Sequence, residues 1–455
     1  MEKTSISRRT LLKGAVVAAG AATAGSLAGP GVASALLSDP VRTPGSLPFP
    51  KLPEGIDLLP QIEHIVVVMM ENHSYDSYFG MLPRGNGFRL GPDGGPLNSN
   101  PDGLGHRIRS FHMPSTCQLD ALPGQDWNRS HTSWNDGRND GFVKASTPVA
   151  MGYWDGTDIP FYYALANTFP LCDRWFGSCL AQTYPNRRFL MAGTAAGIVS
   201  TTTAALTAPP PPNGTIFDRF HAHGISWRNY FSDLPSSAII LKTLEDYPSS
   251  ITPIANFYTD AAAGTLPSFS LVDPNFDHES EENPQDIRVG EQFASKVIQS
   301  VLHSPAWPRT LLIWTYDEHG GYYDHVRPPQ AIPPDAIPPD IHVPPDLPGG
   351  YDRYGFRVPT VIVSPYARPG LVSSRVHDHT SVLKFVETKW NLGALTYRDA
   401  NAHDILETLD LRSPPAFLDP PTLPAPALDA SPDSCAPGDP GGPIPPPEAV
   451  FPIHA

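Results

Sequence analysis

The stretch IEHIVVVMMEN, residues 62–72, decides the fold prediction, because an apolar and largely β-branched run stops at Met70 and is followed at once by Glu71 and Asn72. Uninterrupted apolar runs of this length are typical of strands that are buried on both faces of a sheet. Three later runs have the same form and also precede polar residues: 268–272 before Asp273-Pro274-Asn275, 310–315 before Asp317-Glu318-His319, and 358–364 before Pro365-Tyr366.

Segments with helical periodicity lie between these runs, for example residues 289–302 and 381–390. Alternation of helices with nearly all-apolar strands predicts an α/β fold with a mostly parallel central sheet and helices on both faces. In such sheets ligands bind beyond the carboxyl ends of the strands. The polar residues that follow the runs are therefore the first candidates for a functional site.

Two of the expected strand ends carry paired oxygen donors. Glu71 and Asn72 offer a carboxylate and an amide, and Asp317 and Glu318 place two carboxylates side by side. Adjacent carboxylates repel each other unless a cation lies between them, and the glycines at 320–321 allow the chain to turn sharply there. The alternatives are an ordinary turn at Glu71-Asn72 and a solvated loop at Asp317-Glu318.

The segment QTYPNRR, residues 182–188, contains the candidate nucleophile. Pro185 suits the first turn of a helix, which would place Thr183 just before the helix N-terminus. Free N–H groups and the helix dipole favour an anion at that position, and a hydroxyl beside a metal can lose its proton and attack phosphorus. The alternative is a plain N-cap threonine.

Three histidines complete the candidates: His131 and His278 in polar surroundings, and His379 at the start of an amphipathic helix. Phosphoryl transfer needs donors for three equatorial oxygens and an acid for the leaving alkoxide, and histidine can serve both needs. The alternative for each of them is a surface or structural histidine.

The N-terminus has the parts of a twin-arginine export signal. Arg8-Arg9 is followed by an Ala/Gly-rich apolar stretch over 15–28 and by the small-x-small sequence Ala33-Ser34-Ala35. A membrane anchor is the alternative, for which this stretch is short and rich in glycine and alanine. No later segment approaches 18 uninterrupted apolar residues, so we expect a soluble chain exported by the twin-arginine route.

Composition narrows the class of protein. The 455 residues carry a net charge of −15, which argues against a nucleic-acid-binding surface and is compatible with acidic residues that serve a cation. Four cysteines are too few for a disulfide scaffold and lack the spacing of a zinc site. One bridged pair is compatible with an oxidising compartment, and the sequence leaves the pairing open. The motifs of α/β-hydrolases, P-loop proteins and Rossmann folds are absent from the sequence.

Two segments lie outside the expected core. Residues 328–350, PPQAIPPDAIPPDIHVPPDLPGG, predict a stiff, extended and exposed loop. From about residue 412 the chain is rich in proline, alanine and aspartate, which predicts an irregular tail.

Taken together, these segments resemble the bacterial phosphoesterase family that contains the non-zinc phospholipases C and the respiratory-burst-inhibiting acid phosphatases, within the alkaline phosphatase superfamily. Five stretches between about residues 60 and 390 carry the resemblance in the order of the family: 62–80, 131–143, 151–193, 315–328 (TYDEHGGYYDHVRP) and 354–387.

The resemblance implies an alkaline-phosphatase-like fold and one divalent cation. Calcium, magnesium or manganese suits such hard ligands, and zinc remains an alternative. Thr183 matches the nucleophile, His131 a phosphate-contacting histidine, and His278 and His379 histidines near the phosphate and the leaving group. The expected metal ligands are Glu71, Asn72, Thr183, Asp317 and Glu318. The implied division is a signal peptide (1–35), a phosphoesterase domain (36–405) and a Pro-rich tail (406–455).

We therefore expect an exported, metal-dependent phosphoesterase that is secreted, periplasmic or associated with the cell envelope. The threonine and the export signal favour a phospholipase C that acts through a phosphothreonine intermediate. The alternatives are an acid phosphatase and, in another class, a non-catalytic binding protein of the envelope. Expected partners are a phospholipid or small phosphate ester, the twin-arginine translocation machinery and, transiently, a membrane surface; nucleic acid is not expected.

Overall fold

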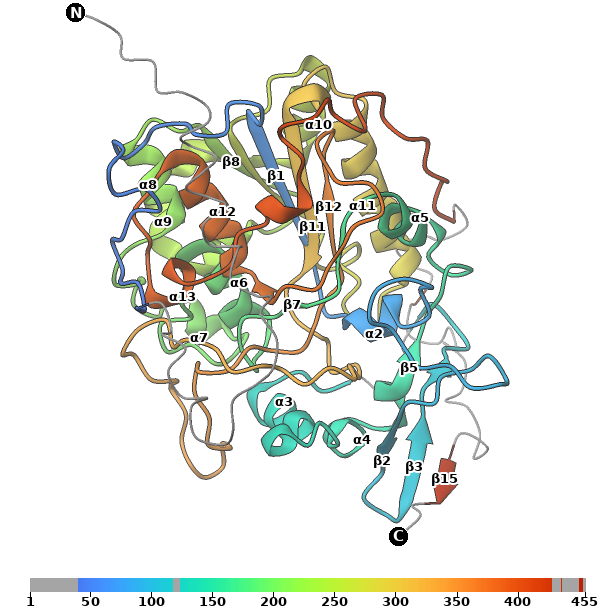
Figure 1. The fold of residues 1–455 in the computed structure, drawn as a ribbon. Helices are drawn as coiled ribbons and strands as arrows, with labels where there is room; N and C mark the ends of the chain where they lie inside the picture. The colour runs from blue at the N-terminus through green and yellow to red at the C-terminus, as the bar shows by residue number, and fades with distance from the viewer. Residues whose placement is uncertain (1–39, 118–122, 428–434, 436–449, 453–455) are drawn as a thin grey trace, which may run out of the picture. The chain divides into compact units, whose positions relative to one another are not determined.

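The centre of the fold is an eight-stranded sheet in the computed structural model, which describes residues 40–117, 123–427, 435 and 450–452 (Figure 1). Its strands lie in the order β13 (Val372–Ser373), β6 (Leu171–Cys172), β12 (Thr360–Val363), β11 (Thr310–Tyr316), β1 (His64–Met70), β10 (Phe269–Asp273), β8 (Trp227–Phe231) and β9 (Ile251–Pro253). All neighbouring pairs are parallel except the two that involve β12. The predicted α/β fold with a mostly parallel sheet is confirmed.

β12 corrects one detail of the prediction. It runs antiparallel to both of its neighbours, so Pro365 and Tyr366 leave the sheet at the edge opposite to Glu71 and Asp317. A parallel return needs a crossover, usually a helix, and residues 317–359 between β11 and β12 contain none. Because this connection stays beside the carboxyl ends of the parallel strands, β12 enters the sheet from that edge.

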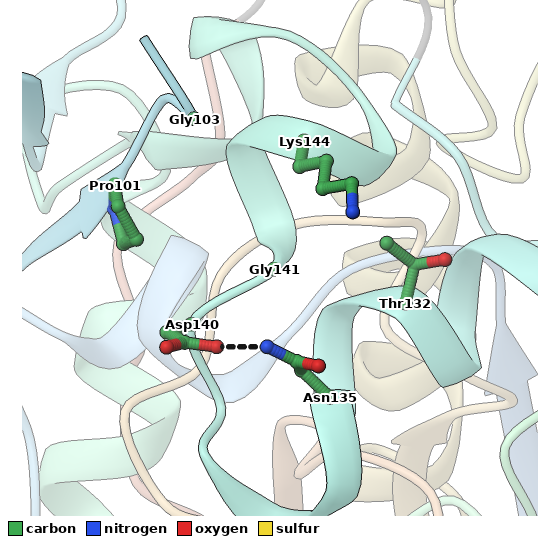
Figure 2. Close-up of a pocket in the computed structure, with 7 residues that line it drawn as sticks. All are labelled: Pro101, Gly103, Thr132, Asn135, Asp140, Gly141 and Lys144. Carbon is green, nitrogen blue, oxygen red and sulfur yellow. Dashed lines mark hydrogen bonds between the residues drawn. The ribbon is translucent and has the colours of Figure 1, made fainter. Parts of the chain in front are cut away.

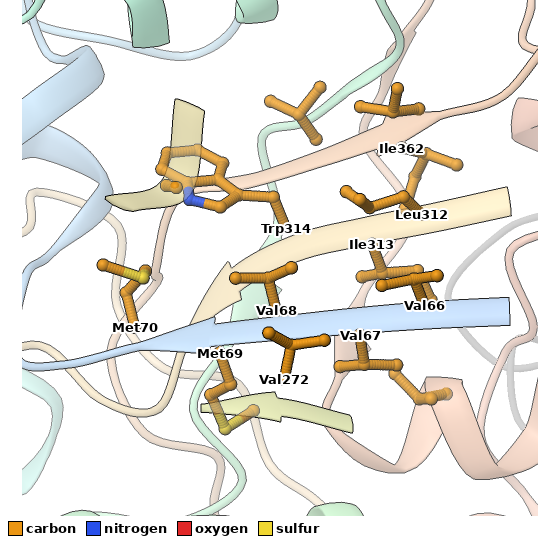
Figure 3. Packing of buried hydrophobic residues seen from close by; sticks show 14 of the residues in the cluster. Val66, Val67, Val68, Met69, Met70, Val272, Leu312, Ile313, Trp314 and Ile362 are labelled. Atoms are coloured by element: carbon orange, nitrogen blue, oxygen red, sulfur yellow. The ribbon is translucent and has the colours of Figure 1, made fainter. Parts of the chain in front are cut away.

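One face of the sheet is covered by α5 (Pro160–Thr168) and α11 (Ile287–Leu302) (Figure 1). Val66 pairs with Leu312 and Val68 with Trp314, and paired residues of neighbouring strands project to the same face (Figure 3). The indole of Trp314 packs against the ring of Tyr162 on α5, with 4.4 Å between the ring centroids.

The opposite face is covered by α8 (Ile216–Ala222) and α12 (Thr380–Trp390). The ring centroid of Phe269 on β10 lies 5.1 Å from that of Phe220 on α8. The ring of Phe220 lies in turn 5.6 Å from that of Trp390 on α12. Since side chains alternate along a strand and the interior of β1 is buried throughout, both faces are apolar. This explains why the run in residues 62–70 shows no polar alternation.

The remaining elements surround this core. Among the described residues, the other α-helices are α2 (Tyr75–Phe79), α3 (Trp127–Trp134), α4 (Phe142–Ala145), α6 (Thr183–Ala192), α7 (Thr203–Leu206), α9 (Leu241–Asp246), α10 (Ile254–Ala263) and α13 (Tyr397–Ala400). The 3₁₀ helices are η2 (Asn135–Gly137), η3 (Pro148–Met151), η4 (Ser236–Ile239), η5 (Pro248–Ser250), η6 (Trp307–Arg309) and η7 (Leu406–Thr408). Small sheets pair β14 (His377–Asp378) with β7 (Trp175–Phe176), β4 (Phe111–His112) with β5 (Gly152–Tyr153), and β3 (His106–Arg109) with β2 (Ser99–Pro101) and β15 (Val450–Pro452).

The Pro-rich loop is irregular, as predicted, and so is the tail over residues 412–427, whereas β15 further along the tail is a short strand. The loop 328–350 is held at both ends, because the Tyr397 N–H donates to the carbonyl of Pro334 and the Trp127 indole donates to that of Leu347. In the tail, the ring of Phe417 packs against the ring of Phe169, with 4.8 Å between the two centroids. A disulfide between Cys117 and Cys435 ties the tail to the rest of the chain, and Cys172 and Cys179 are buried free thiols.

The predicted twin-arginine signal lies outside the described residues, and the domain boundaries at 35 and 405 stay predictions. From Arg42 onward the described chain forms one compact unit. Within the part of the chain that the structure describes, no helix combines the length and the apolar character needed to cross a membrane.

Candidate active site

The acidic strand ends meet at one edge of the sheet. β11, β1 and β10 are adjacent and parallel, so Asp317, Glu71 and Asp273 follow one another across this edge. The backbone N–H of Asn72 donates to Oδ1 of Asp317 over 3.1 Å, which joins the ends of β1 and β11 directly. The predicted proximity of these two segments is therefore present in the folded chain.

Gly320 allows this close approach. It adopts a φ of +64°, and a Cβ at this position would lie 1.7 Å from the carbonyl oxygen of Asn72. Any other residue would collide with the backbone that follows β1. The sharp turn predicted at residues 320–321 thus has a specific purpose, which is to pack one strand end against the other.

Helix α6 points its first turn at the same edge. It begins at Thr183 itself, with Gln182 as the N-cap, so the predicted helix start is one residue late. One turn further on, the guanidinium of Arg187 lies 3.2 Å from Asp317 and 3.8 Å from Glu71.

Thr183 shares a helix face with Arg187, because residues four apart on a helix are neighbours. Burial raises the pKa of the adjacent Tyr184 phenol, and the charge of Glu71 raises it further, which also places the start of α6 beside that carboxylate. Thr183 is 5% exposed. The structure therefore brings the first turn of α6 to the acidic strand ends, while the role of Thr183 as nucleophile stays a prediction.

Burial destabilises the ionised forms of Glu71 and Glu318. Burial raises the pKa of Glu71 well above its usual value, and Arg187 offsets part of this effect. Burial also raises the pKa of Glu318, and the neighbouring charge of Asp317 adds to the effect. Such a cluster favours a bound cation, since a positive charge would restore the ionised forms.

Several oxygen atoms of this cluster are free to bind an ion. Among the described residues, Oε2 of Glu71, Oε1 of Glu318 and both polar atoms of the Asn72 side chain are buried without a hydrogen-bond partner. Asp317 is already engaged, because its Oδ1 accepts the N–H of Glu318 and its Oδ2 lies against Arg187. These hard oxygen donors fit a divalent cation of the calcium or magnesium type.

His379 touches the cluster from α12. Its Nε2–H donates to the carbonyl of Asp317 over 2.6 Å, and its Nδ1 accepts the indole N–H of Trp175 over 3.5 Å. Burial lowers the pKa of His379, in keeping with a neutral ring. Both ring nitrogens are thus occupied, which positions the Asp317 backbone; the predicted role near the leaving group stays a prediction.

His131 lies on α3, where its Nδ1–H donates to the carbonyl of Trp127 over 2.8 Å and its ring packs tilted against the indole, with 4.2 Å between the ring centroids. Burial lowers its pKa. A Cβ on Gly349 would lie 2.2 Å from Nε2, so the end of the Pro-rich loop packs against this ring. His131 is thereby held rigidly, and its contact with phosphate stays a prediction.

His278 has an exposed side chain in the loop after β10. Its loop neighbours do reach the cluster: Phe276 lies under the guanidinium of Arg187, 5.0 Å from it, and the carbonyl of Ser280 accepts the N–H of Glu71. The loop is therefore adjacent to the site, and the predicted role of His278 stays a prediction.

The structure adds residues that the sequence analysis missed. Arg187 also lies 3.7 Å from Asp273, so one guanidinium faces three carboxylates. Glu282 raises the pKa of Glu71 and Glu318 and so belongs to the same charge cluster. Arg187 stands in the quoted QTYPNRR segment, and Asp273 directly follows a predicted strand, so a signal existed for both; Glu282 lies in a polar loop without periodicity.

Two other features lie apart from this cluster. A hollow of about 180 Å³ between α3, α4 and the turn after β2 is lined by Lys144, Asp140 and Asn135 among others, and by none of the predicted site residues (Figure 2). His112, Asp155 and Asp158 bring ligand atoms within 4.8 Å of one another. Their own contacts, such as 2.7 Å between His112 and Asp158, account for that grouping.

Comparison with known proteins places this geometry in a family. The model of the Phosphoesterase family matches residues 62–393, which include both acidic strand ends, α6 and α12. The chain belongs to the Phosphoesterase family. The family assignment makes it a hydrolase of ester bonds, as predicted.

Relatives of this phosphoesterase include phospholipase C A of Mycobacterium tuberculosis, 30% identical over 82% of each chain, and phospholipase C B of the same organism, 31% identical over 91% of this chain and 88% of the relative. Non-specific phospholipase C1 of Arabidopsis thaliana is 31% identical over 82% of this chain and 75% of its own. A solved structure from Vibrio parahaemolyticus, described as a protein in the alkaline phosphatase superfamily, overlaps 66% of this chain and 72% of its own with 12% identity and a TM-score of 0.37. The family assignment rests on the sequence matches.

Proposed function

We propose that this phosphoesterase is a metal-dependent phospholipase C that converts phospholipids to diacylglycerol and a phosphorylated head group. The main support is the meeting of two acidic strand ends, which carry unpartnered buried oxygens, with the first turn of the helix that begins at Thr183. The names of the relatives described above favour a lipid diester over a phosphomonoester.

The proposed ion site uses oxygen ligands alone. When bound, a divalent cation would lower the pKa of the Thr183 hydroxyl and screen the charge of the phosphate. Calcium, magnesium and manganese prefer such ligands, and zinc also accepts them. The residues that would hold it are Glu71, Asn72, Thr183, Asp317 and Glu318.

Thr183 Oγ1 attacks phosphorus in line with the leaving alcohol, so that a threonine–phosphorus ester bond forms as the bond to diacylglycerol breaks. In this proposal His131 contacts a non-bridging oxygen through Nε2, which takes up a proton as the anionic phosphate binds, because its Nδ1–H already donates to the carbonyl of Trp127. His278 is the better proton source for the alkoxide, since its side chain is exposed whereas His379 already uses both ring nitrogens. Water then attacks phosphorus, releases the phosphorylated head group and returns Thr183.

The test compares diacylglycerol release from phosphatidylcholine with phosphate release from p-nitrophenyl phosphate, with and without added divalent metal. We expect the lipid reaction to dominate, chelation to abolish it and metal to restore it. Thr183→Ala is expected to lower turnover on the order of 10³-fold or more with metal content and folding retained, because the nucleophile is lost. Unchanged turnover would remove Thr183 from the mechanism, and strong monoesterase activity without lipid hydrolysis would make the chain a phosphatase.

We also propose export by the twin-arginine route to the cell surface or beyond, with transient contact to a membrane surface during lipid hydrolysis. The support is the paired Arg8-Arg9 before an apolar stretch. Replacing both arginines with lysine is expected to retain folded enzyme in the cytoplasm. Undiminished export of this variant would contradict the assignment.

A further inference from the structure

Glu282 lies beside the acidic cluster in the loop that follows β10. This loop runs along the end of β1, where the Glu71 N–H donates to the carbonyl of Ser280 over 3.0 Å. The Glu282 carboxylate accepts from the side chain of Gln125 over 3.3 Å. Burial raises the pKa of Glu282 and the charge of Asp317 raises it further, which shows that the two carboxylates interact.

The backbone on each side of Glu282 is anchored. Asn283 accepts the hydroxyl of Tyr322 over 2.6 Å, and Gln285 accepts the backbone N–H of Glu281 over 3.1 Å. The buried Glu281 carboxyl accepts three tyrosine hydroxyls, those of Tyr78, Tyr162 and Tyr316. Glu282 is therefore presented in a fixed position rather than on a loose loop.

Exposure distinguishes Glu282 from the other members of the cluster. Glu71, Asp317 and Glu318 are at most 4% exposed, whereas Glu282 is half-buried. The side chain of Asn72 is fully buried and, within the described chain, has no hydrogen-bond partner of normal geometry; it lowers the pKa of Glu282 and so lies beside that carboxylate. Glu282 is thus the carboxylate of this cluster that solvent, and therefore a substrate, reaches most readily.

We propose that Glu282 is a specificity-determining residue that favours singly charged phosphodiesters over doubly charged phosphomonoesters. This inference rests on the proposed function, because it requires phosphate esters to react at the Thr183 site. A diester phosphate carries one negative charge, and a monoester carries nearly two at neutral pH.

The discrimination is electrostatic. Glu71, Asp317 and Asp273 lie against the guanidinium of Arg187, and Glu318 and Glu282 belong to the same charge cluster, so a divalent ion still leaves an excess of negative charge. One additional substrate charge at a distance of about 6–10 Å from Glu282 would then lower monoester turnover by roughly tenfold or more relative to the diester. A carboxylate further inside the cluster could not do this selectively, since the ion would neutralise it.

The experiment measures kcat/KM of the metal-loaded full chain for bis(p-nitrophenyl) phosphate and for p-nitrophenyl phosphate at neutral pH. Glu282→Gln is expected to lower the diester-to-monoester ratio by about tenfold, while Glu282→Asp, which keeps the charge, retains the ratio. Glu279→Gln is the matched control, because Glu279 lies in the same loop and its pKa responds to Lys296, Asp233 and His278, which serves both esters alike, rather than to the acidic cluster. Its ratio should equal that of the wild type.

An unchanged ratio in Glu282→Gln, with Thr183-dependent turnover of both esters, would overturn the inference and leave the proposed function intact. Loss of bound metal in Glu282→Gln would also overturn it, since Glu282 would then be a ligand. The same variants are also assayed with p-nitrophenyl phosphorylcholine, and a change seen only with that substrate would overturn the inference and assign Glu282 to the head-group cation. If the wild type hydrolysed neither ester, or did so without Thr183, the proposed function itself would fail.

Discussion

Arg187 carries the charge balance of the strand ends. Its side chain is 1% exposed and faces Asp317, Glu71 and Asp273. Without the Arg187 guanidinium, these three buried carboxylates would lose the cationic side chain that contacts each of them. The arginine therefore keeps the acidic edge folded before any ion is bound.

Replacing Arg187 with glutamine should destabilise the metal-free chain by about 3–5 kcal/mol, because removing one partner of a buried ion pair leaves uncompensated charge. The free energy of unfolding in urea after chelation is the measurement. Arg188→Gln is the control: Arg188 is equally buried on α6 but contacts the carbonyl of Pro209 instead of a carboxylate. We expect it to cost about 1–2 kcal/mol, and equal losses in both variants would contradict this account.

Glu281 gives stability a pH dependence. Burial raises its pKa to about 8 in the folded chain, from a usual value of 4.5. Between these values the folded state holds a proton that the unfolded state has lost, so the free energy of unfolding should fall as pH rises from about 5 to 8, by at most about 1.4 kcal/mol per unit from this group. Glu281→Gln cannot titrate, so its urea midpoints should fall less steeply over this range; parallel curves would show that Glu281 does not titrate there.

At the scale of elements, the turn after β11 holds two strand ends together. Gly320→Ala should destabilise the chain by about 3 kcal/mol and lower activity. The new Cβ would collide with the Asn72 carbonyl, and alanine would also be strained by the positive φ. Gly370→Ala separates the two costs, since Gly370 has a φ of +67° with nothing within 4 Å of its Cβ position. The measurements are the thermal unfolding and the turnover of both variants, and we expect the larger loss in Gly320→Ala. Equal losses in the two variants would show that the contact with Asn72 is unimportant.

The strands and two acidic ends could be predicted because their signal is local: an apolar run that stops at a carboxylate needs no tertiary information. The direction of β12 could not be predicted, because an apolar run has the same pattern in a parallel and in an antiparallel strand. Only the connection before β12, which contains no helix, determines its direction. Glu282 was not predicted as a site residue for a related reason. Its neighbour His278 offered the more suggestive side chain, yet the fold leaves His278 exposed and turns Glu282 toward the cluster.

At the scale of the whole molecule, the chain after α13 packs back over the core. The carbonyl of Phe417 accepts the indole N–H of Trp307, and Leu423 is buried. These contacts are few and come from an irregular segment, so they would hold the tail weakly by themselves. The Cys117–Cys435 disulfide closes a loop with a sequence separation of 318 residues and keeps the tail near the segment it packs on.

This bond should contribute about 2–5 kcal/mol, because a crosslink between distant residues restricts the unfolded chain. Cys117→Ser is expected to lower the free energy of unfolding by that amount, and reductant should shift the wild type to the same midpoint without moving the variant. Thiol titration checks the pairing: of the four cysteines, only Cys172 and Cys179 should react after unfolding without reductant, and neither should react in the native chain, since both are buried. Four reactive thiols in the oxidised, unfolded protein would contradict the bridge, and an unchanged midpoint in Cys117→Ser would mean that the packing of the tail alone suffices.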